Sequence, residues 1–170
     1  RGKDPKRAEV EIARLRADKV ASPMVETLAA RARLEQGDAA GALAILKAAM
    51  QRYPSRRSVL YALLGTLQEL GRHDEVLAAL AEPLRFYPRD PKLQEARAKA
   101  YAGQGKRLLQ HQAQAEVYFL QGSLPAAIEQ LQYAQAAGDG NFYEQSAVDA
   151  RLKELRAEHL RDMQDAKKSK

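Results

Sequence analysis

The sequence has no cysteine, no tryptophan and only three histidines among its 170 residues. The lack of cysteine excludes disulfides, thiolate zinc sites and a thiol nucleophile. His73, His111 and His159 are too far apart for the His-Glu-x-x-His spacing that places two zinc ligands on one helix face. No serine lies in a nucleophile elbow. The sequence therefore predicts no catalytic, cofactor-binding or metal-binding residue in this chain.

Long apolar runs and β-branched runs are also missing. No apolar stretch approaches the ~20 residues that a membrane-spanning helix requires. Hydrophobic residues make up 45% of the chain and charged residues 29%, which is the composition of a folded protein and not of a disordered one. Alanine and leucine, with Gln, Glu, Arg and Lys, dominate, and these are the strongest helix formers. The composition predicts an all-α fold.

The net charge of +6 raises the question of nucleic-acid binding. Part of the basic excess lies at the two ends, in residues 1–7 and 167–170, and the rest is scattered. Basic stripes interleaved with stacking aromatics, which single-strand binding needs, are missing. We interpret most of the charge as a solvated surface.

A fixed period is the main positive signal. Gly37, Gly71 and Gly105 are 34 residues apart, and so are Pro54 and Pro88, each 17 residues after a glycine. A glycine that closes one helix and a proline that ends the next predict a helix, a tight turn and a returning helix. The positions that define the repeat are Gly37, Ala42, Pro54, Gly71, Pro88, Gly105, Gly122 and Ala127.

The side chains between these positions follow helical spacing. Small or aliphatic residues stand seven residues before the glycines, namely Ala30, Leu64, Ala98 and Ala115. Five, nine and twelve residues after a glycine come Ala42, Leu46 and Ala49, or Ala127, Leu131 and Ala134. This alternation resembles the tetratricopeptide repeat (TPR) over residues 23–138, and it implies a TPR-type α-solenoid of about nine antiparallel helices.

The expected organisation follows from the period. An N-terminal helix and lead-in occupy 1–22, repeats occupy 23–138, a capping helix occupies 139–164 and a disordered basic tail occupies 165–170. The repeats divide into 23–56, 57–90, and 91–105 with an irregular continuation over 106–138. The expected helices are 5–18, 23–36, 39–53, 56–70, 73–87, 91–104, 106–121, 124–137 and 141–164.

Three local features modify this pattern. Pro83 lies inside the expected helix 73–87 and should kink it. Gly105 and Gly122 are only 17 residues apart, so the helix 106–121 must be the second member of one pair and the first member of the next. Asn141 followed by Glu144 predicts a capping box at the start of the last helix.

The inward-facing positions of TPR first helices identify a candidate concave groove for protein segments. The residues at these positions are Arg31, Leu34, Glu35, Tyr61, Gln68, Glu69, Lys92, Glu95, Lys99, Gln112, Glu116 and Phe119. The set mixes long charged side chains, amides and two aromatics. The only asparagine is Asn141, outside the repeats, so a carboxylate clamp built on Lys, Arg and Asn is not expected.

The second half carries a more specific resemblance. The segments 113–122 (AQAEVYFLQG), 126–131 (AAIEQL), 141–146 (NFYEQS) and 149–156 (DARLKELR), with Ala21-Ser22-Pro23 before the first unit, resemble the C-terminal end of periplasmic zinc metalloproteases related to the β-barrel assembly-enhancing protease. The resemblance implies the partner- and substrate-binding half of a Gram-negative periplasmic protease. In that family the zinc belongs to a preceding His-Glu-x-x-His domain, which is not in these residues.

The resemblance also implies protein partners and a periplasmic location. The expected partners are its own protease domain and the outer-membrane β-barrel assembly machinery or its client barrels, with no nucleic acid and no membrane insertion. Because the sequence begins at Arg1 and not at Met, we expect a mature product or an excised fragment. Two alternatives stay open: a stand-alone TPR scaffold or pilotin-like assembly factor, and an RNA-binding helical array.

Overall fold

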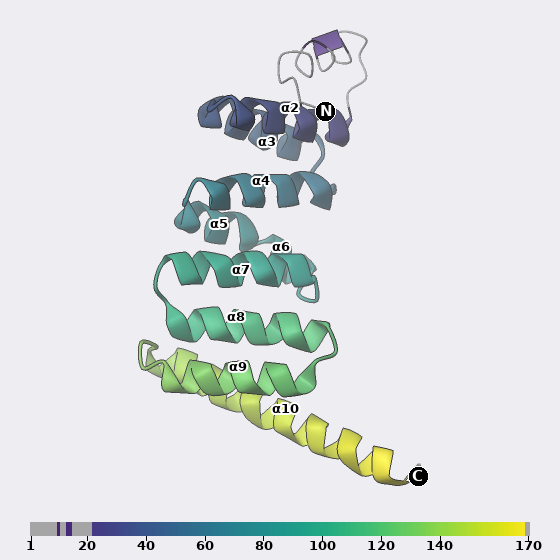
Figure 1. Ribbon diagram of the computed structural model, residues 1–170, viewed down its shortest axis with the longest axis vertical. Helices are drawn as coiled ribbons and strands as arrows, with labels where there is room; N and C mark the ends of the chain where they lie inside the picture. Colours follow the sequence, from purple (N-terminus) through teal and green to yellow (C-terminus); the bar gives the residue numbers. More distant parts are fainter. Residues whose placement is uncertain (1–9, 11–12, 15–21, 169–170) are drawn as a thin grey trace, which may run out of the picture. The chain divides into compact units, whose positions relative to one another are not determined.

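The computed structural model describes residues 10, 13–14 and 22–168 (Figure 1). Within these residues all regular secondary structure is helical, and no strand is present. The expected helix 5–18 and most of the lead-in 1–22 lie outside the described residues. From Pro23 onward the all-α prediction is confirmed.

The expected helices from 23–36 onward are present with boundaries shifted by a few residues, except 73–87, which is divided into two. The helices are α2 (Pro23–Glu35), α3 (Ala39–Arg52), α4 (Arg57–Glu69), α5 (His73–Leu80), α6 (Pro83–Phe86), α7 (Pro91–Gly103), α8 (Arg107–Leu120), α9 (Leu124–Ala136) and α10 (Phe142–Lys168).

The glycines of the repeat close their helices in a left-handed conformation. Gly37 has φ of 79° and Gly71 has φ of 67°. After each of them the next residue's N–H returns to a carbonyl of the last turn, from Asp38 to Arg33 at 2.9 Å and from Arg72 to Leu67 at 2.9 Å. This is the Schellman cap, and it requires a residue that tolerates positive φ. The turns at Gly105 and Gly122 repeat the same bonds.

Two sequence features at helix ends are confirmed and one is corrected. The expected helix 73–87 breaks into α5 and α6, and Pro83 becomes the first residue of α6 because it has no N–H to continue α5. At α10, the Asn141 N–H donates to Glu144 Oε2 at 2.9 Å and the Glu144 N–H donates to Asn141 Oδ1 at 3.0 Å, which is the predicted capping box. The expected disordered tail is wrong over 165–168, where α10 continues; residues 169–170 lie outside the described residues.

The chain divides into two compact units, and the division falls between Arg72 and His73. In the first unit α2 packs on α3 and α4, and α3 packs on α4. We call α2–α3–α4 the first module. Its core contains Ala30, Ala42, Leu46 and Leu64, all at predicted repeat positions and all at most 4% exposed.

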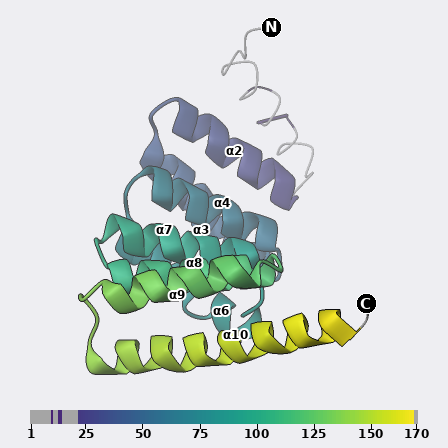
Figure 2. The ribbon, with the colours of Figure 1, turned by 60° about the horizontal axis from the view of Figure 1, so that its bottom comes forward.

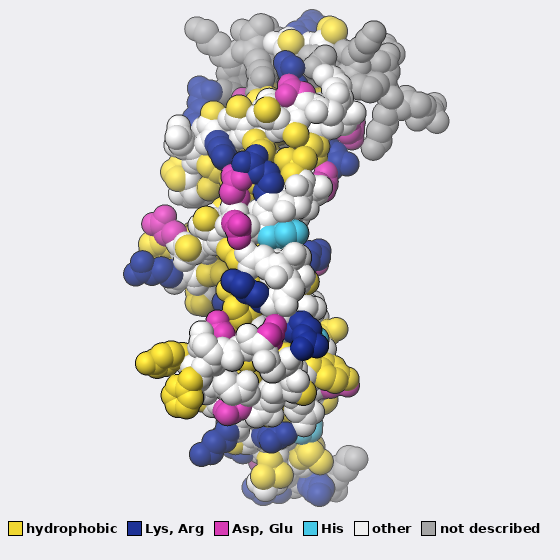
Figure 3. Space-filling view, turned by 90° about the vertical axis from the view of Figure 1, so that its left-hand side faces the viewer, with side chains coloured by type: hydrophobic (Ala, Val, Ile, Leu, Met, Phe, Trp, Pro, Cys, Tyr) yellow, Lys and Arg dark blue, Asp and Glu magenta, His cyan; other side chains and the backbone are white. Residues whose placement is uncertain are grey.

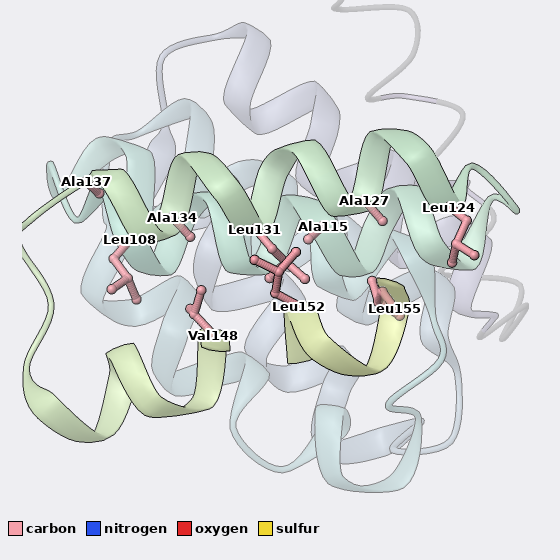
Figure 4. Close-up of a cluster of buried hydrophobic side chains, with 10 residues drawn as sticks. All are labelled: Leu108, Ala115, Leu124, Ala127, Leu131, Ala134, Ala137, Val148, Leu152 and Leu155. Carbon is pink, nitrogen blue, oxygen red and sulfur yellow. The ribbon is translucent and has the colours of Figure 1, made fainter. Parts of the chain in front are cut away.

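In the second unit α5 packs on α7, α7 on α8, α8 on α9, and α10 on both α9 and α8. We call α8–α9–α10 the second module. Its core joins Leu131 from α9 with Ala115 from α8 and Leu152 from α10 (Figure 4). Leu155 is the last buried residue of α10. The C-terminal part of α10 continues past the end of α9 (Figure 2).

The helix α8 has the double role that the 17-residue glycine spacing predicts. It contacts α7 on one side and both α9 and α10 on the other, whereas α7 and α9 do not touch among the described helices. Its first turn is capped from a distant loop, because its own N-cap Lys106 supplies no side-chain hydrogen bond. Asp139 accepts from the N–H groups of Arg107 at 2.6 Å and Leu108 at 2.9 Å. The loop between α9 and α10 thereby fastens the start of α8.

Candidate functional site

The first module brings three of the predicted groove residues into one ionic cluster. Arg31 of α2 donates through Nε to Glu35 Oε1 at 3.2 Å and through Nη1 to Glu69 Oε1 of α4 at 3.1 Å. The hydrogen bond from Arg31 to Glu35, followed by the charge of Glu69 and the hydrogen bond to it, raises the pKa of Arg31. All three side chains are exposed, so salt screens this cluster and it adds little to stability.

Beside this cluster lies a recess of about 190 Å³, which we call the α2–α4 recess. Its lining residues are Thr27, Ala30, Arg31, Leu46, Ala62, Gly65, Thr66 and Glu69. Leu46 of α3 is fully buried, while Arg31 and Glu69 are the charged residues of the lining. Since a cavity of ~150 Å³ accommodates benzene, this recess has room for one aliphatic side chain of a partner.

Small residues on two helices create the recess. Ala30 on α2 and Ala62, Gly65 and Thr66 on α4 leave space where longer side chains would meet. A Cβ built on Gly65 finds no atom within 4 Å, so the space is open above that position. Sequence reasoning identified Ala30 and Leu46 as repeat positions, but it missed Thr27, Ala62, Gly65 and Thr66. A glycine in a helix interior was the available signal, because it costs stability and indicates a close approach or an open space.

The other predicted residues of the first unit do not line the recess. Leu34, Tyr61 and Gln68 are half-buried.

In the second module two further predicted residues meet a residue that sequence reasoning did not select. Arg151 of α10 donates to Glu116 of α8 through two nitrogens, at 2.8 and 3.0 Å, and to Glu154 at 2.7 Å. Its guanidinium carbon lies 4.5 Å from the centroid of the Phe119 ring. Burial disfavours the charge of Arg151, but the hydrogen bonds to Glu116 and Glu154 outweigh it and raise its pKa. Phe119, which was expected to face a partner, therefore packs against an arginine of the same chain.

The predicted residues on α7 remain at the surface. Lys92, Glu95 and Lys99 are exposed, and Lys99 pairs with Glu95 at 2.7 Å. Gln112 of α8 is half-buried. Basic and acidic side chains are interspersed on the face that Figure 3 shows, with no patch of one sign.

A second recess, of about 360 Å³, lies between α8 and α9 and is wider and more polar. Arg107, His111 and Tyr133 line it, with Ala136 and Ala137. Its polar groups are largely engaged: His111 Nδ1 lies 2.9 Å from Gln130 Oε1, and the Tyr133 hydroxyl donates to Glu129 at 2.8 Å. That hydrogen bond, with the charge of Glu129, raises the pKa of Tyr133.

Over the part of the chain that the structure describes, no three His, Cys, Asp or Glu side chains gather as a metal site would require. In the same residues no helix combines the length and apolarity needed to cross a membrane.

Comparison with known families gives one match. A tetratricopeptide repeat model matches residues 33–100, from the end of α2 into α7. No curated protein matches the chain. With the helix pairs described above, the match confirms the predicted fold class, an all-α TPR-type solenoid. Tetratricopeptide repeats bind protein partners and are typically non-catalytic, so the match supports a protein-interaction domain.

Proposed function

We propose that this chain captures segments of other proteins through the first module, with the α2–α4 recess taking an anchoring side chain. The observation that carries the proposal is a recess large enough for one side chain, lined by small and aliphatic residues with two threonines. Exposed charged groups of two neighbouring first helices lie beside it. Recognition sites of this kind combine a pocket that gives affinity with polar groups at the edge that fix the direction of the segment.

A variant that fills the recess tests the proposal. Gly65→Leu places a side chain in the open space without a backbone clash, because nothing lies within 4 Å of the Cβ position. We expect the wild-type chain to enrich a family of sequences from a phage-displayed decapeptide library, and Gly65→Leu to lose that enrichment. The control Ala44→Leu adds a similar side chain on the exposed face of α3 and should leave the enrichment unchanged.

Circular dichroism melting of both variants must first show an intact fold. Equal enrichment by wild type and folded Gly65→Leu, or no enrichment by wild type, would contradict binding through the recess.

The resemblance of segments 113–122, 126–131, 141–146 and 149–156 extends the proposal to a biological role. In this view the chain is the partner-binding half of a Gram-negative periplasmic zinc metalloprotease that acts in outer-membrane β-barrel assembly and quality control. The zinc and the catalytic residues would belong to a protease domain outside these residues. Unfolded barrel strands expose apolar side chains and unpaired backbone groups, and a pocket such as the α2–α4 recess suits them.

The coding sequence upstream of Arg1 tests this role. A His-Glu-x-x-His domain in the same reading frame supports it. An upstream region without such a domain contradicts it and favours the stand-alone scaffold, for which the binding surface within these residues is sufficient.

A further inference from the structure

We propose that the α2–α4 recess selects a segment in which an aliphatic residue stands next to Arg or Lys. The aliphatic side chain enters the recess and the neighbouring cation pairs with the carboxylates of Glu35 and Glu69. This inference rests on the proposed function and adds the chemistry of the partner.

The charges around the recess are unbalanced. One guanidinium, that of Arg31, faces two carboxylates, those of Glu35 and Glu69, which leaves one negative charge. Arg31 bonds to Oε1 of each carboxylate and not to Oε2. The side chains of Glu35 and Glu69 are 37% and 53% exposed, so these oxygens are within reach of a partner's cation.

The lining of the recess accounts for the preference for an aliphatic side chain. Ala30, Leu46, Ala62 and Gly65 offer no hydrogen-bonding side chain, and the Thr27 hydroxyl already donates to the Met24 carbonyl at 2.9 Å. A polar side chain that entered the recess would therefore find few partners to replace its hydration. An aliphatic side chain gains free energy with each CH₂ group that it buries. At about 190 Å³, the volume admits a leucine or isoleucine and is small for a tryptophan.

The second module shows the same pairing formed within the chain. Glu116 lies six residues before Gly122, as Arg31 lies six residues before Gly37, so the two residues occupy the same repeat position. There, a carboxylate of the first helix receives the guanidinium of Arg151 from the third helix, with Phe119 beneath it. A first-helix surface of this protein thus already accommodates an arginine against a carboxylate and an apolar side chain.

The test uses the full 170-residue chain and three fluorescein-labelled decapeptides in a Gly-Ser background. Their central pairs are Leu-Arg, Leu-Glu and Ser-Arg. At low salt, fluorescence anisotropy should show that Leu-Arg binds about five- to tenfold more tightly than Leu-Glu, because exposed charge pairs contribute modestly and reversal changes attraction into repulsion. Ser-Arg should bind at least as weakly as Leu-Glu because it leaves the recess empty.

Matched variants assign the preference to the two carboxylates. In the double variant Glu35→Gln/Glu69→Gln the advantage of Leu-Arg over Leu-Glu should disappear. In the control Glu82→Gln, at an exposed position just before α6 and outside the candidate groove, it should persist. Leu-Glu binding as tightly as Leu-Arg, while Gly65→Leu still abolishes binding, would overturn the charge preference and keep the proposed function. Peptide binding that Gly65→Leu leaves unchanged, or no binding of any peptide, would overturn both.

Discussion

The two three-helix modules place an ion pair at the same repeat position but use it differently. In the first module the pair runs from Arg31 on α2 to Glu69 on α4, and both side chains are more than half exposed. In the second module the charges are reversed, from Glu116 on α8 to Arg151 on α10, and both side chains are about one-fifth exposed. The difference indicates that the third helix of each module, α4 or α10, determines whether the surface of the first helix remains accessible. α4 contributes the small residues Gly65 and Thr66, which leave a recess. α10 contributes Arg151, whose guanidinium lies over the Phe119 ring.

The largest expected effect concerns the two core leucines at equivalent positions, Leu46 and Leu131, both fully buried. Replacement by alanine should lower the free energy of unfolding by about 2–5 kcal/mol in each case. Leu46→Ala should lie at the lower end of this range, because Leu46 already borders the α2–α4 recess. Urea denaturation followed by circular dichroism measures both values, and a larger loss for Leu46→Ala would indicate that the recess is closed in solution.

The next prediction concerns how much each of the two ion pairs contributes to stability. Arg151→Met keeps most of the apolar side chain but leaves Glu116 half-buried without its bidentate partner, which should cost about 1–3 kcal/mol. Arg31→Met removes an exposed, salt-screened cation, and its unfolding midpoint in urea should stay close to that of wild type. Equal losses of stability in the two variants would contradict the claim that only the half-buried ion pair stabilises the fold.

Helix capping also differs between the modules, and the pH dependence of stability measures this difference. In the first module Asp38 caps its own helix α3 by accepting from the Gly41 N–H at 2.8 Å, whereas in the second module Asp139 caps α8 from a distant loop. The hydrogen bond from the Leu108 N–H, with that from Arg107, lowers the pKa of Asp139. The carboxylate therefore stabilises the fold above the unfolded-state pKa of about 3.9, and this contribution is lost as the pH falls through the lower folded-state pKa.

Asp139→Asn should accordingly lower the melting temperature at pH 7, and the difference from wild type should shrink as the pH falls below about 4. Asp162→Asn on the exposed end of α10 is the control and should show no such pH-dependent difference. A difference between Asp139→Asn and wild type that is the same at pH 3 and pH 7 would show that the carboxylate charge does not act at α8.

The smallest effect has opposite signs at two helical glycines. Gly65→Ala should raise the free energy of unfolding by roughly 0.5–1 kcal/mol, because alanine favours the helix and its Cβ enters open space. Gly103→Ala should lower it, because its Cβ would overlap the ring of His73, which packs against that turn. Thermal melts of the two variants measure the sign, and stabilisation by Gly103→Ala would contradict the packing of α5 on α7.

Much of the fold could be predicted from glycines, prolines and capping residues, because each of them meets a local requirement of the backbone. Gly37 and Gly71 are needed where φ is positive, Pro83 cannot continue a helix, and Asn141 with Glu144 satisfies the first turn of α10. These causes operate within a few residues, so the sequence displays them directly.

The site could be predicted only in part, because it depends on which side chains meet across helices. Arg31, Glu35 and Glu69 follow from the repeat register, but the recess beside them arises from the absence of side-chain volume at Gly65 and Ala62. Arg151 looked like one more polar residue of a capping helix. Its role depends on α10 packing against α8 as a third helix, and no local pattern reveals that contact.

The most direct test of segment binding in the α2–α4 recess is an NMR titration of the ¹⁵N-labelled chain with the Leu-Arg decapeptide. The account predicts that the largest amide shifts occur at Ala30, Arg31, Gly65 and Thr66. Largest shifts in α8, α9 or α10, including the recess at His111 and Tyr133, would contradict it.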